Sequence, residues 1–170
     1  MIEIKKAQAG DRDALADIFL GHISANPEYI SHGEIQMGVG VGEFRDGRLC
    51  ARPSDNAREM WLKYIDAHIS DEDSALVLKG VKEGRIVGFC VADIEEDGAD
   101  PFGMVCDVLV TEASRGEGLG GTLLARAIEW LRSKGIKDIY LESGLNNHSA
   151  HSFFEKRGFH HISQIFKLED

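Results

Sequence analysis

Residues 115–121 read Arg-Gly-Glu-Gly-Leu-Gly-Gly, and this stretch decides how the rest of the chain is interpreted. It lies between an apolar run that ends at Val110 and an amphipathic pattern typical of a helix. Glycines allow tight backbone turns and leave N–H groups uncovered, and the first four N–H groups of a helix have no partner inside it. Because the helix dipole adds positive charge there, the stretch predicts a binding site for a phosphate or pyrophosphate.

Two classes of nucleotide site can be compared with this loop. Gly116, Gly118 and Gly121 satisfy the dinucleotide-binding pattern G-x-G-x-x-G, and Glu142 ends the next strand, where a ribose-binding acid is expected. A dinucleotide fold needs several further βα elements, and too few residues follow Glu142 to form them. A Walker-type site is excluded because no Gly-Lys-Ser/Thr triplet follows the glycines.

The pattern Arg115-x-x-Gly118-x-Gly120 resembles the GNAT superfamily of acyl-CoA-dependent N-acetyltransferases, in which Arg/Gln-x-x-Gly-x-Gly/Ala follows a strand. Residues 147–159 read Asn-x-x-Ala-x-x-Phe-Phe-Glu-Lys-x-Gly-Phe and are similar to a second element of that family. Residues 84–89 and the opening residues 2–7 add further similarity. The resemblance covers residues 1–22 and 74–168.

The resemblance and the hydrophobic patterns predict an α/β (α+β) fold. We expect a single domain over residues 1–170, with a mixed, mostly antiparallel central sheet of roughly six to seven strands and about four helices. The strands are expected at residues 2–6, 75–81, 85–94, 102–110, 138–142 and 159–168. Residues 24–56 are rich in glycine and irregular, so loops and short strands are expected there. Within this domain, residues 24–70 are the expected acceptor-substrate region and residues 102–168 the acetyl-CoA-binding half.

For the cosubstrate, the resemblance implies acetyl-CoA. Its pyrophosphate would lie on the glycine loop and its pantetheine arm along the strand at 102–110. Arg115 either adds a charge to this site or is an exposed loop arginine, and Asn147 either binds the pantetheine amide region or caps a helix. The cofactor-binding residues expected on this basis are Val108, Leu109, Val110, Arg115, Gly116, Glu117, Gly118, Leu119, Gly120, Gly121, Asn147, Ala150 and Phe154.

Acetyl transfer to an amine requires a neutral nucleophile, although an alkyl ammonium has a pKa near 10.4. Asp107 is the candidate base or substrate anchor, because many family members have an acid at this place. Strict alternation puts Asp107 on the same strand face as Val105 and Leu109. The alternative interpretation is a solvated carboxylate near the end of a strand.

The sequence departs from the family pattern at the proton donor. The family's tyrosine aligns with Phe154, whose ring has no proton to donate. Either another side chain protonates the leaving sulfur or the thiolate of CoA leaves unaided. The candidate side chains are Tyr140, Ser143, His148 and His151.

These observations favour an N-acetyltransferase that moves an acetyl group from acetyl-CoA to a primary amine of a small molecule or peptide, in a direct ternary complex. The alternative is an acyl-CoA-binding module with little or no turnover. The absence of the family's phenol at Phe154 supports this alternative.

Composition restricts the partners and the compartment. The net charge of −10 disfavours nucleic acid and anionic membranes. Cys50, Cys90 and Cys106 are odd in number and widely spaced, and the chain opens without a signal-like segment, so a reduced, cytoplasmic protein is expected. The clustered histidines near the C-terminus lack a recognisable ligand set, and no metal is expected. Since dimers are common in the family, a homodimer is the oligomer to test for.

Overall fold

The computed structural model describes all residues 1–170, and the chain divides into two compact units. The first unit consists of Met1–Phe19 and Trp61–Leu141, and the second consists of Leu20–Met60 and Glu142–Asp170. None of the helices is both long and apolar enough to cross a membrane.

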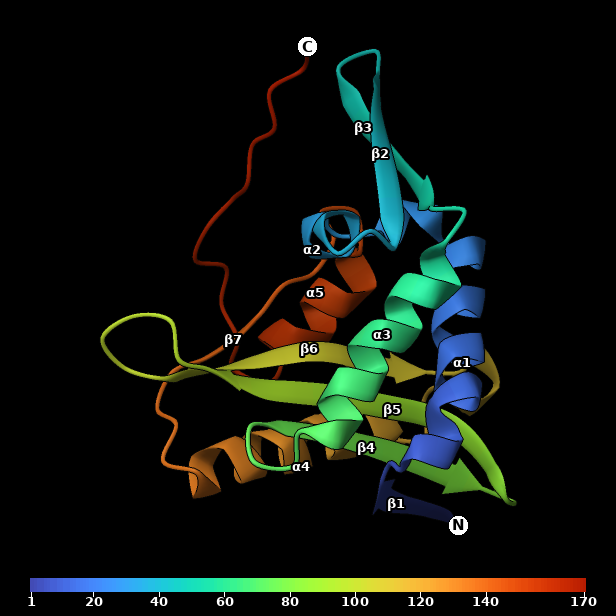
Figure 1. Ribbon diagram of the computed structural model, residues 1–170, viewed down its shortest axis with the longest axis vertical. Helices are drawn as coiled ribbons and strands as arrows, with labels where there is room; N and C mark the ends of the chain where they lie inside the picture. The colour runs from blue at the N-terminus through green and yellow to red at the C-terminus, as the bar shows by residue number, and fades with distance from the viewer. The chain divides into compact units, whose positions relative to one another are not determined.

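The first unit is built on a five-stranded sheet with the strand order β1-β4-β5-β6-β7 (Figure 1). Neighbouring strands run antiparallel, except for β6 and β7, which are parallel. The fold class predicted from the sequence is therefore confirmed. The strands are β1 (Ile2–Lys6), β4 (Ala75–Lys82), β5 (Arg85–Glu95), β6 (Phe102–Val110) and β7 (Ile139–Leu141), and the helices wholly or partly in this unit are α1 (Arg12–Ala25), α3 (Ala57–Ser70) and α4 (Leu119–Ser133).

Helices cover both faces of this sheet (Figure 1). Helix α4 has an apolar stripe whose members Leu123 and Leu131 are fully buried. It packs closely, because a Cβ atom at Gly103 of β6 would meet the side chain of Leu131 at 2.8 Å. On the other face, Trp61 of α3 packs edge-on against Phe89 of β5, with ring centroids 5.7 Å apart. The core of the unit therefore has two layers, one on each side of the sheet.

Two tight turns of this unit follow from local sequence. The β4–β5 hairpin turns at Glu83 and Gly84, whose φ angles of 52° and 76° are both left-handed. Helix α4 ends before Gly135, whose φ of 83° is typical of a glycine just past a helix C-terminus. In both places a glycine takes the left-handed conformation that the turn requires.

The second unit contains most of the irregular region of the sequence. It has a two-stranded sheet and two short helices, namely β2 (Gly40–Arg45), β3 (Arg48–Pro53), α2 (His32–Gln36) and α5 (His148–Glu155). Ser31 and Glu34 form a capping box at the start of α2. Gly144 lies directly against the carbonyl oxygen of Tyr29, so that no larger residue fits there.

The strand predicted at residues 159–168 is wrong. These residues form neither a helix nor a strand. The apolar side chains from Ile162 onward stay in solvent, and Phe166 is 88% exposed. Alternating hydrophobicity gives a strand only when a neighbouring strand pairs with its backbone and covers one face. The seven strands of the protein are therefore divided between a five-stranded and a two-stranded sheet, rather than joined in one central sheet.

Candidate functional site

The glycine loop connects a short 3-10 helix, Glu112–Ser114, to helix α4. Gly116 and Gly118 have φ angles of 83° and 80°, in the left-handed region that favours glycine. A Cβ atom added at either residue would meet nothing within 4 Å. The loop conformation therefore requires glycine for its dihedral angles, and the space above its main chain is open to a ligand.

The N-terminus of α4 follows directly on this loop. Gly118 is the N-cap residue, and its carbonyl oxygen accepts the hydrogen bond of the Thr122 N–H at 3.1 Å. The N–H groups of the first turn precede this bond, so they have no carbonyl of the helix to bind. No acidic residue lies in that turn. The loop and helix therefore present backbone donors and the positive end of a dipole at one place, as an anion site requires.

Two charged side chains flank the glycines. Nε of Arg115 donates a hydrogen bond of 3.2 Å to the carbonyl oxygen of Val110, which ties the exposed arginine to the end of β6. The carboxylate of Glu117 accepts hydrogen bonds of 2.7 and 2.8 Å from Nζ of Lys82. The positive charge of Lys82 therefore offsets the one negative charge of the loop.

Strand β6 has one partly unpaired edge. It pairs with β7 only from Gly103 to Val105, whereas its pairing with β5 continues to Val110. Beyond Val105, the strand therefore has a sheet partner on one side only. Val108 and Leu109 lie in this part, where backbone N–H and C=O groups can bind an extended ligand.

A β-bulge in β6 corrects the predicted orientation of Asp107. The register shifts so that Asp107 pairs with Val91 while Val105 pairs with Ala92. Val91 and Ala92 are neighbours in one strand and point to opposite faces, so their partners do as well. The expectation that Asp107 shares a face with Val105 is wrong, because one extra residue interrupts the alternation. The shared face with Leu109 is confirmed, since Leu109 pairs with Phe89, two residues from Val91.

Asp107 lies beneath helix α3 and is bound there by a tyrosine. Oη of Tyr64 donates a hydrogen bond of 2.7 Å to Oδ2 of Asp107. Burial raises the pKa of Tyr64 well above its usual value, and the charge of Asp107 raises this pKa further. Tyr64 therefore remains a neutral hydrogen-bond donor, and the carboxylate is held in one orientation.

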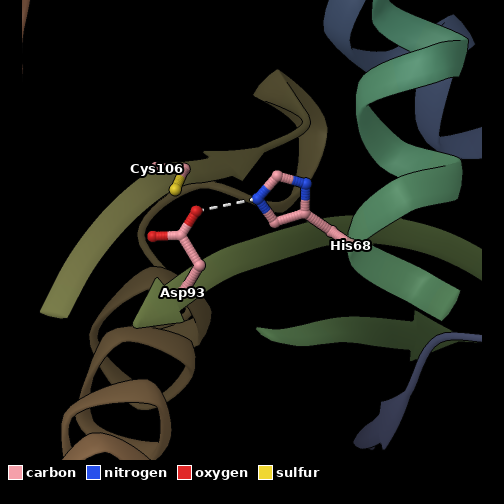
Figure 2. Close-up of side chains that lie close together, drawn as sticks. All are labelled: His68, Asp93 and Cys106. Atoms are coloured by element: carbon pink, nitrogen blue, oxygen red, sulfur yellow. Dashed lines mark hydrogen bonds and ion pairs between the residues drawn. The ribbon is translucent and has the colours of Figure 1, made fainter. Parts of the chain in front are cut away.

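A second group of side chains lies one helical turn further along α3 (Figure 2). His68 has an acceptor at each ring nitrogen, namely the carbonyl oxygen of Tyr64 at 2.8 Å from Nδ1 and Oδ2 of Asp93 at 2.9 Å from Nε2. Burial lowers the pKa of His68, but the hydrogen bonds to Asp93 and to the carbonyl oxygen outweigh it, so the pKa is raised overall. Both partners are hydrogen-bond acceptors, so these contacts favour the doubly protonated ring.

Cys106 lies beside this pair, at the bulge of β6. Burial raises the pKa of its thiol above the usual range, and the carboxylates of Asp93 and Asp107 raise it further. The thiol is therefore protonated, and these surroundings do not favour a nucleophilic thiolate.

The predicted cofactor residues of the second unit lie on α5. Oδ1 of Asn147 accepts a hydrogen bond of 3.3 Å from the N–H of Ala150, so Asn147 caps this helix. Phe154 is half-buried and packs its ring against Phe153 and Phe159, with centroids 5.2 and 6.0 Å apart. The capping contact uses the side-chain oxygen of Asn147, and the predicted pantetheine contacts of these residues remain predictions.

The four candidate proton donors have different surroundings. Tyr140 of β7 is 39% exposed and packs edge-on against Phe102. Nε2 of His151 donates to the carbonyl oxygen of Gly144 at 2.9 Å, and His148 lies against the ring of His151. Ser143 is half-buried. These contacts single out none of the four as the donor.

The dinucleotide interpretation does not fit the structure. The sheet is mostly antiparallel, whereas a dinucleotide-binding fold is built on parallel strands. Oε1 of Glu142, the expected ribose ligand, instead accepts a hydrogen bond of 2.7 Å from the N–H of Gly33 in α2.

Tyr64, His68 and Asp93 are the polar residues that sequence reasoning missed. In the sequence, Tyr64 and His68 recur at helical spacing among apolar residues, and Asp93 begins an acidic stretch. The signal was a tyrosine and a histidine four positions apart on a face that packs on a sheet. Buried polar side chains need partners, so such a pair indicates acceptors on the strands below.

Comparison with known proteins identifies similar chains. Residues 42–159 match the family described as Acetyltransferase (GNAT) family. N-alpha-acetyltransferase 30 of Schizosaccharomyces pombe is 21% identical over 121 residues, which cover 70% of this chain and 80% of that protein. Aminoglycoside N(6')-acetyltransferase type 1 of Stenotrophomonas maltophilia is 24% identical over 109 residues, covering 61% of this chain and 71% of that protein.

A solved structure with the same fold contains the expected cosubstrate. It is a predicted acetyltransferase from Clostridium acetobutylicum, crystallised with acetyl-CoA. It has a TM-score of 0.70 and 15% sequence identity, and the match covers 99% of this chain and 96% of that chain. At this identity, the likeness shows a shared fold.

Proposed function

This chain belongs to the acetyltransferase (GNAT) family, and from that premise we propose that it transfers an acetyl group from acetyl-CoA to a primary amine in a direct ternary complex. The observation that carries the proposal is the glycine loop. Gly116 and Gly118 are left-handed, and the first turn of α4 offers backbone donors without an acidic side chain. A diphosphate bound there meets several charge-assisted hydrogen bonds, each contributing about 1.5–3 kcal/mol.

The pantetheine arm extends along β6 in this proposal. The main-chain groups of Val108, Leu109 and Val110 follow the last β6–β7 pair, at the edge that β7 leaves unpaired. Arg115, bonded to the carbonyl oxygen of Val110, brings a positive charge to the end of the same edge. Contacts from Asn147, Ala150 and Phe154 are carried over from the family motif.

In the proposed reaction, the neutral amine nitrogen attacks the thioester carbonyl carbon. The C–N bond forms, the C–S bond breaks, and CoA leaves with the electron pair on sulfur. Asp107 either accepts the proton of the attacking ammonium or holds the ammonium by charge. Its carboxylate is suited to both roles because Tyr64 orients it from α3 at 2.7 Å. The proton that neutralises the sulfur comes from solvent or from one of the four candidate donors, since Phe154 has none to give.

The acceptor is proposed to be a small-molecule or peptide amine. The net charge of −10 favours a cationic molecule at the surface. One relative is named as an aminoglycoside acetyltransferase and another as a ribosomal protein bS18-alanine N-acetyltransferase, so small-molecule and protein amines both belong in a substrate test. Residues 24–70 are the proposed acceptor region, and a homodimer is the proposed assembly to examine by light scattering.

Two measurements test the proposal. Calorimetry is expected to give a dissociation constant for acetyl-CoA well below about 1 mM, with no binding of NAD or ATP. Thiol release from acetyl-CoA is then measured with polyamines, aminoglycosides, amino acids and N-terminal peptides. Binding without thiol release for any amine would favour the acyl-CoA-binding module. Absence of acetyl-CoA binding at saturating concentration would overturn both functions.

A further inference from the structure

Three potential metal ligands of different chemistry meet beneath helix α3. Nε2 of His68, a carboxylate oxygen of Asp93 and Sγ of Cys106 all lie within 4.8 Å of one another. They come from α3, β5 and β6, and in Figure 2 the three side chains point toward one another. We propose that this cluster, the His68–Asp93–Cys106 site, binds a single zinc ion. The proposal goes beyond acetyl transfer and does not depend on it.

The carboxylate has an unfilled bonding position. Oδ2 of Asp93 accepts the hydrogen bond of His68 Nε2 at 2.9 Å. Oδ1 is buried and has no hydrogen-bond partner. A buried carboxylate oxygen without a partner is costly, because its hydration is lost without replacement. A cation between Asp93 and its neighbours would satisfy this atom.

The histidine is oriented as a zinc ligand would be. Zinc-bound imidazole usually donates its other N–H to a carboxylate or a backbone carbonyl, which fixes the ring and its tautomer. Nδ1 of His68 already bonds the carbonyl oxygen of Tyr64 at 2.8 Å, so Nε2 is the nitrogen directed at Asp93. With Nδ1 held by the helix backbone, loss of the Nε2 proton leaves a lone pair aimed at the site.

Alternation along β6 brings the sulfur to this face. Met104 pairs with Asp93, and Cys106 lies two residues after Met104, so both are on the face opposite Val105. The register shift leaves Cys106 without a paired residue on β5, between Val105 and Asp107. The thiol therefore lies beside Asp93 and His68.

The distances and the donor set favour zinc. Bond lengths of about 2.0 Å to nitrogen and oxygen and 2.3 Å to sulfur place the three tetrahedral ligand atoms roughly 3.3–3.5 Å apart. Side-chain rotations that shorten a separation of 4.8 Å by about 1.3 Å bring the three atoms into range. A thiolate beside an imidazole disfavours Mg²⁺ and Ca²⁺, which prefer oxygen ligands. The fourth position is left to water.

The charges balance when the ion binds. When His68 donates to both of its acceptors, its imidazolium neutralises Asp93, and the thiol is uncharged. Zinc displaces one proton from Nε2 and one from Sγ, so two positive charges replace two protons and the net charge of the site does not change. His68 and Asp93 are 14% and 18% exposed, which leaves the ion a route from solvent.

Cobalt titration tests the proposal directly. The protein is freed of metal with a chelator and titrated with Co²⁺, which reports a thiolate ligand by a near-ultraviolet charge-transfer band and tetrahedral geometry by strong visible bands. We expect both signals to saturate at one equivalent and to disappear on addition of one equivalent of Zn²⁺. An excess of Mg²⁺ should leave them unchanged.

Single-residue variants test whether the metal binds at the His68–Asp93–Cys106 site or at another cysteine. Cys106→Ser is expected to abolish the charge-transfer band, and His68→Gln or Asp93→Asn to weaken zinc binding at least about tenfold. Cys50→Ser, at an exposed cysteine of β3, is the matched control and should keep the full signal. Near-ultraviolet circular dichroism verifies that each variant is folded. A wild type without the bands, or a folded Cys106→Ser variant that retains them, would overturn the proposal.

Discussion

The hydroxyl of Tyr64 donates to Oδ2 of Asp107 at 2.7 Å and thereby joins helix α3 to the bulged part of strand β6. Tyr64 lies one helical turn before His68, whose ring bonds the carbonyl oxygen of the same tyrosine. One residue therefore holds two polar side chains in place, Asp107 of the sheet through its hydroxyl and His68 of the same helix through its backbone carbonyl. This arrangement makes Tyr64 the positioning residue of the proposed active site.

Replacing Tyr64 by phenylalanine removes only the hydroxyl. A hydrogen bond to a charged group contributes about 1.5–3 kcal/mol, so kcat/KM should fall on the order of 10- to 100-fold. Affinity for acetyl-CoA, measured by calorimetry, should not change. A double-mutant cycle with Asp107→Asn provides the control, because Tyr64→Phe should have little further effect once the carboxylate is gone. Fully additive losses would mean that the tyrosine does not act through Asp107.

The proposed anion site can be tested by adding a negative charge to the loop and comparing it with a neutral side chain of the same shape. Gly120 lies in the first turn of α4, where the backbone is already helical. Gly120→Asp should keep the helix intact, since an acid near a helix N-terminus is favourable. Its negative charge should weaken acetyl-CoA binding at least about tenfold relative to Gly120→Asn, which has nearly the same shape. Calorimetry gives both constants, and equal affinities would remove the loop from the site.

Phe154→Tyr restores the phenol of the family pattern. If protonation of the departing sulfur limits turnover, kcat should rise on the order of tenfold, less than the usual effect of a general acid because a thiolate leaves readily. KM for acetyl-CoA should stay the same. Phe153→Tyr, which adds the same hydroxyl to the neighbouring ring, should leave kcat unchanged. An unchanged kcat in the Phe154 variant would indicate that the thiolate departs without an acid.

Stability of the second unit should depend on pH through Glu34. Burial raises the pKa of Glu34, its hydrogen bonds with Ser31 oppose this, and the charge of Glu142 raises the pKa further. A carboxyl with a raised pKa in the folded state stabilises the fold below the unfolded value of 4.5, and this contribution is lost as pH rises through the folded pKa. The Glu34→Gln variant lacks this loss.

The difference in unfolding free energy, Glu34→Gln minus wild type, should therefore increase between about pH 4 and pH 7. Urea denaturation at a series of pH values measures it. Glu28→Gln, at an exposed carboxylate of the same unit, controls for the general removal of a negative charge. A difference that decreases as pH rises contradicts the assignment.

Local sequence was enough to predict the elements around the glycine loop. The turn residues Gly116 and Gly118 and the start of α4 directly after them lie where the pattern indicated. Each of these features depends on residues within a few positions of one another. The strand predicted at 159–168 failed for the opposite reason, since a strand exists only with a partner that its own residues do not specify.

The polar groups beneath α3 could not be predicted in this way. Alternation along β6 put Asp107 with Val105, and nothing local to the strand reveals the extra residue that reverses this. The meeting of His68, Asp93 and Cys106 needs the pairing of β5 with β6 together with the packing of α3 on the sheet.

By itself, the sequence determined the features from which the anion site is proposed, because glycine dihedral freedom and a helix N-terminus are properties of one continuous stretch. Tertiary structure alone decided which side chains face Asp107, and which of the three cysteines lies beside a histidine and a carboxylate. The physical reason is register. A shift of one residue between two strands exchanges the faces of a sheet, and only the pairing of β5 with β6 sets where that shift occurs.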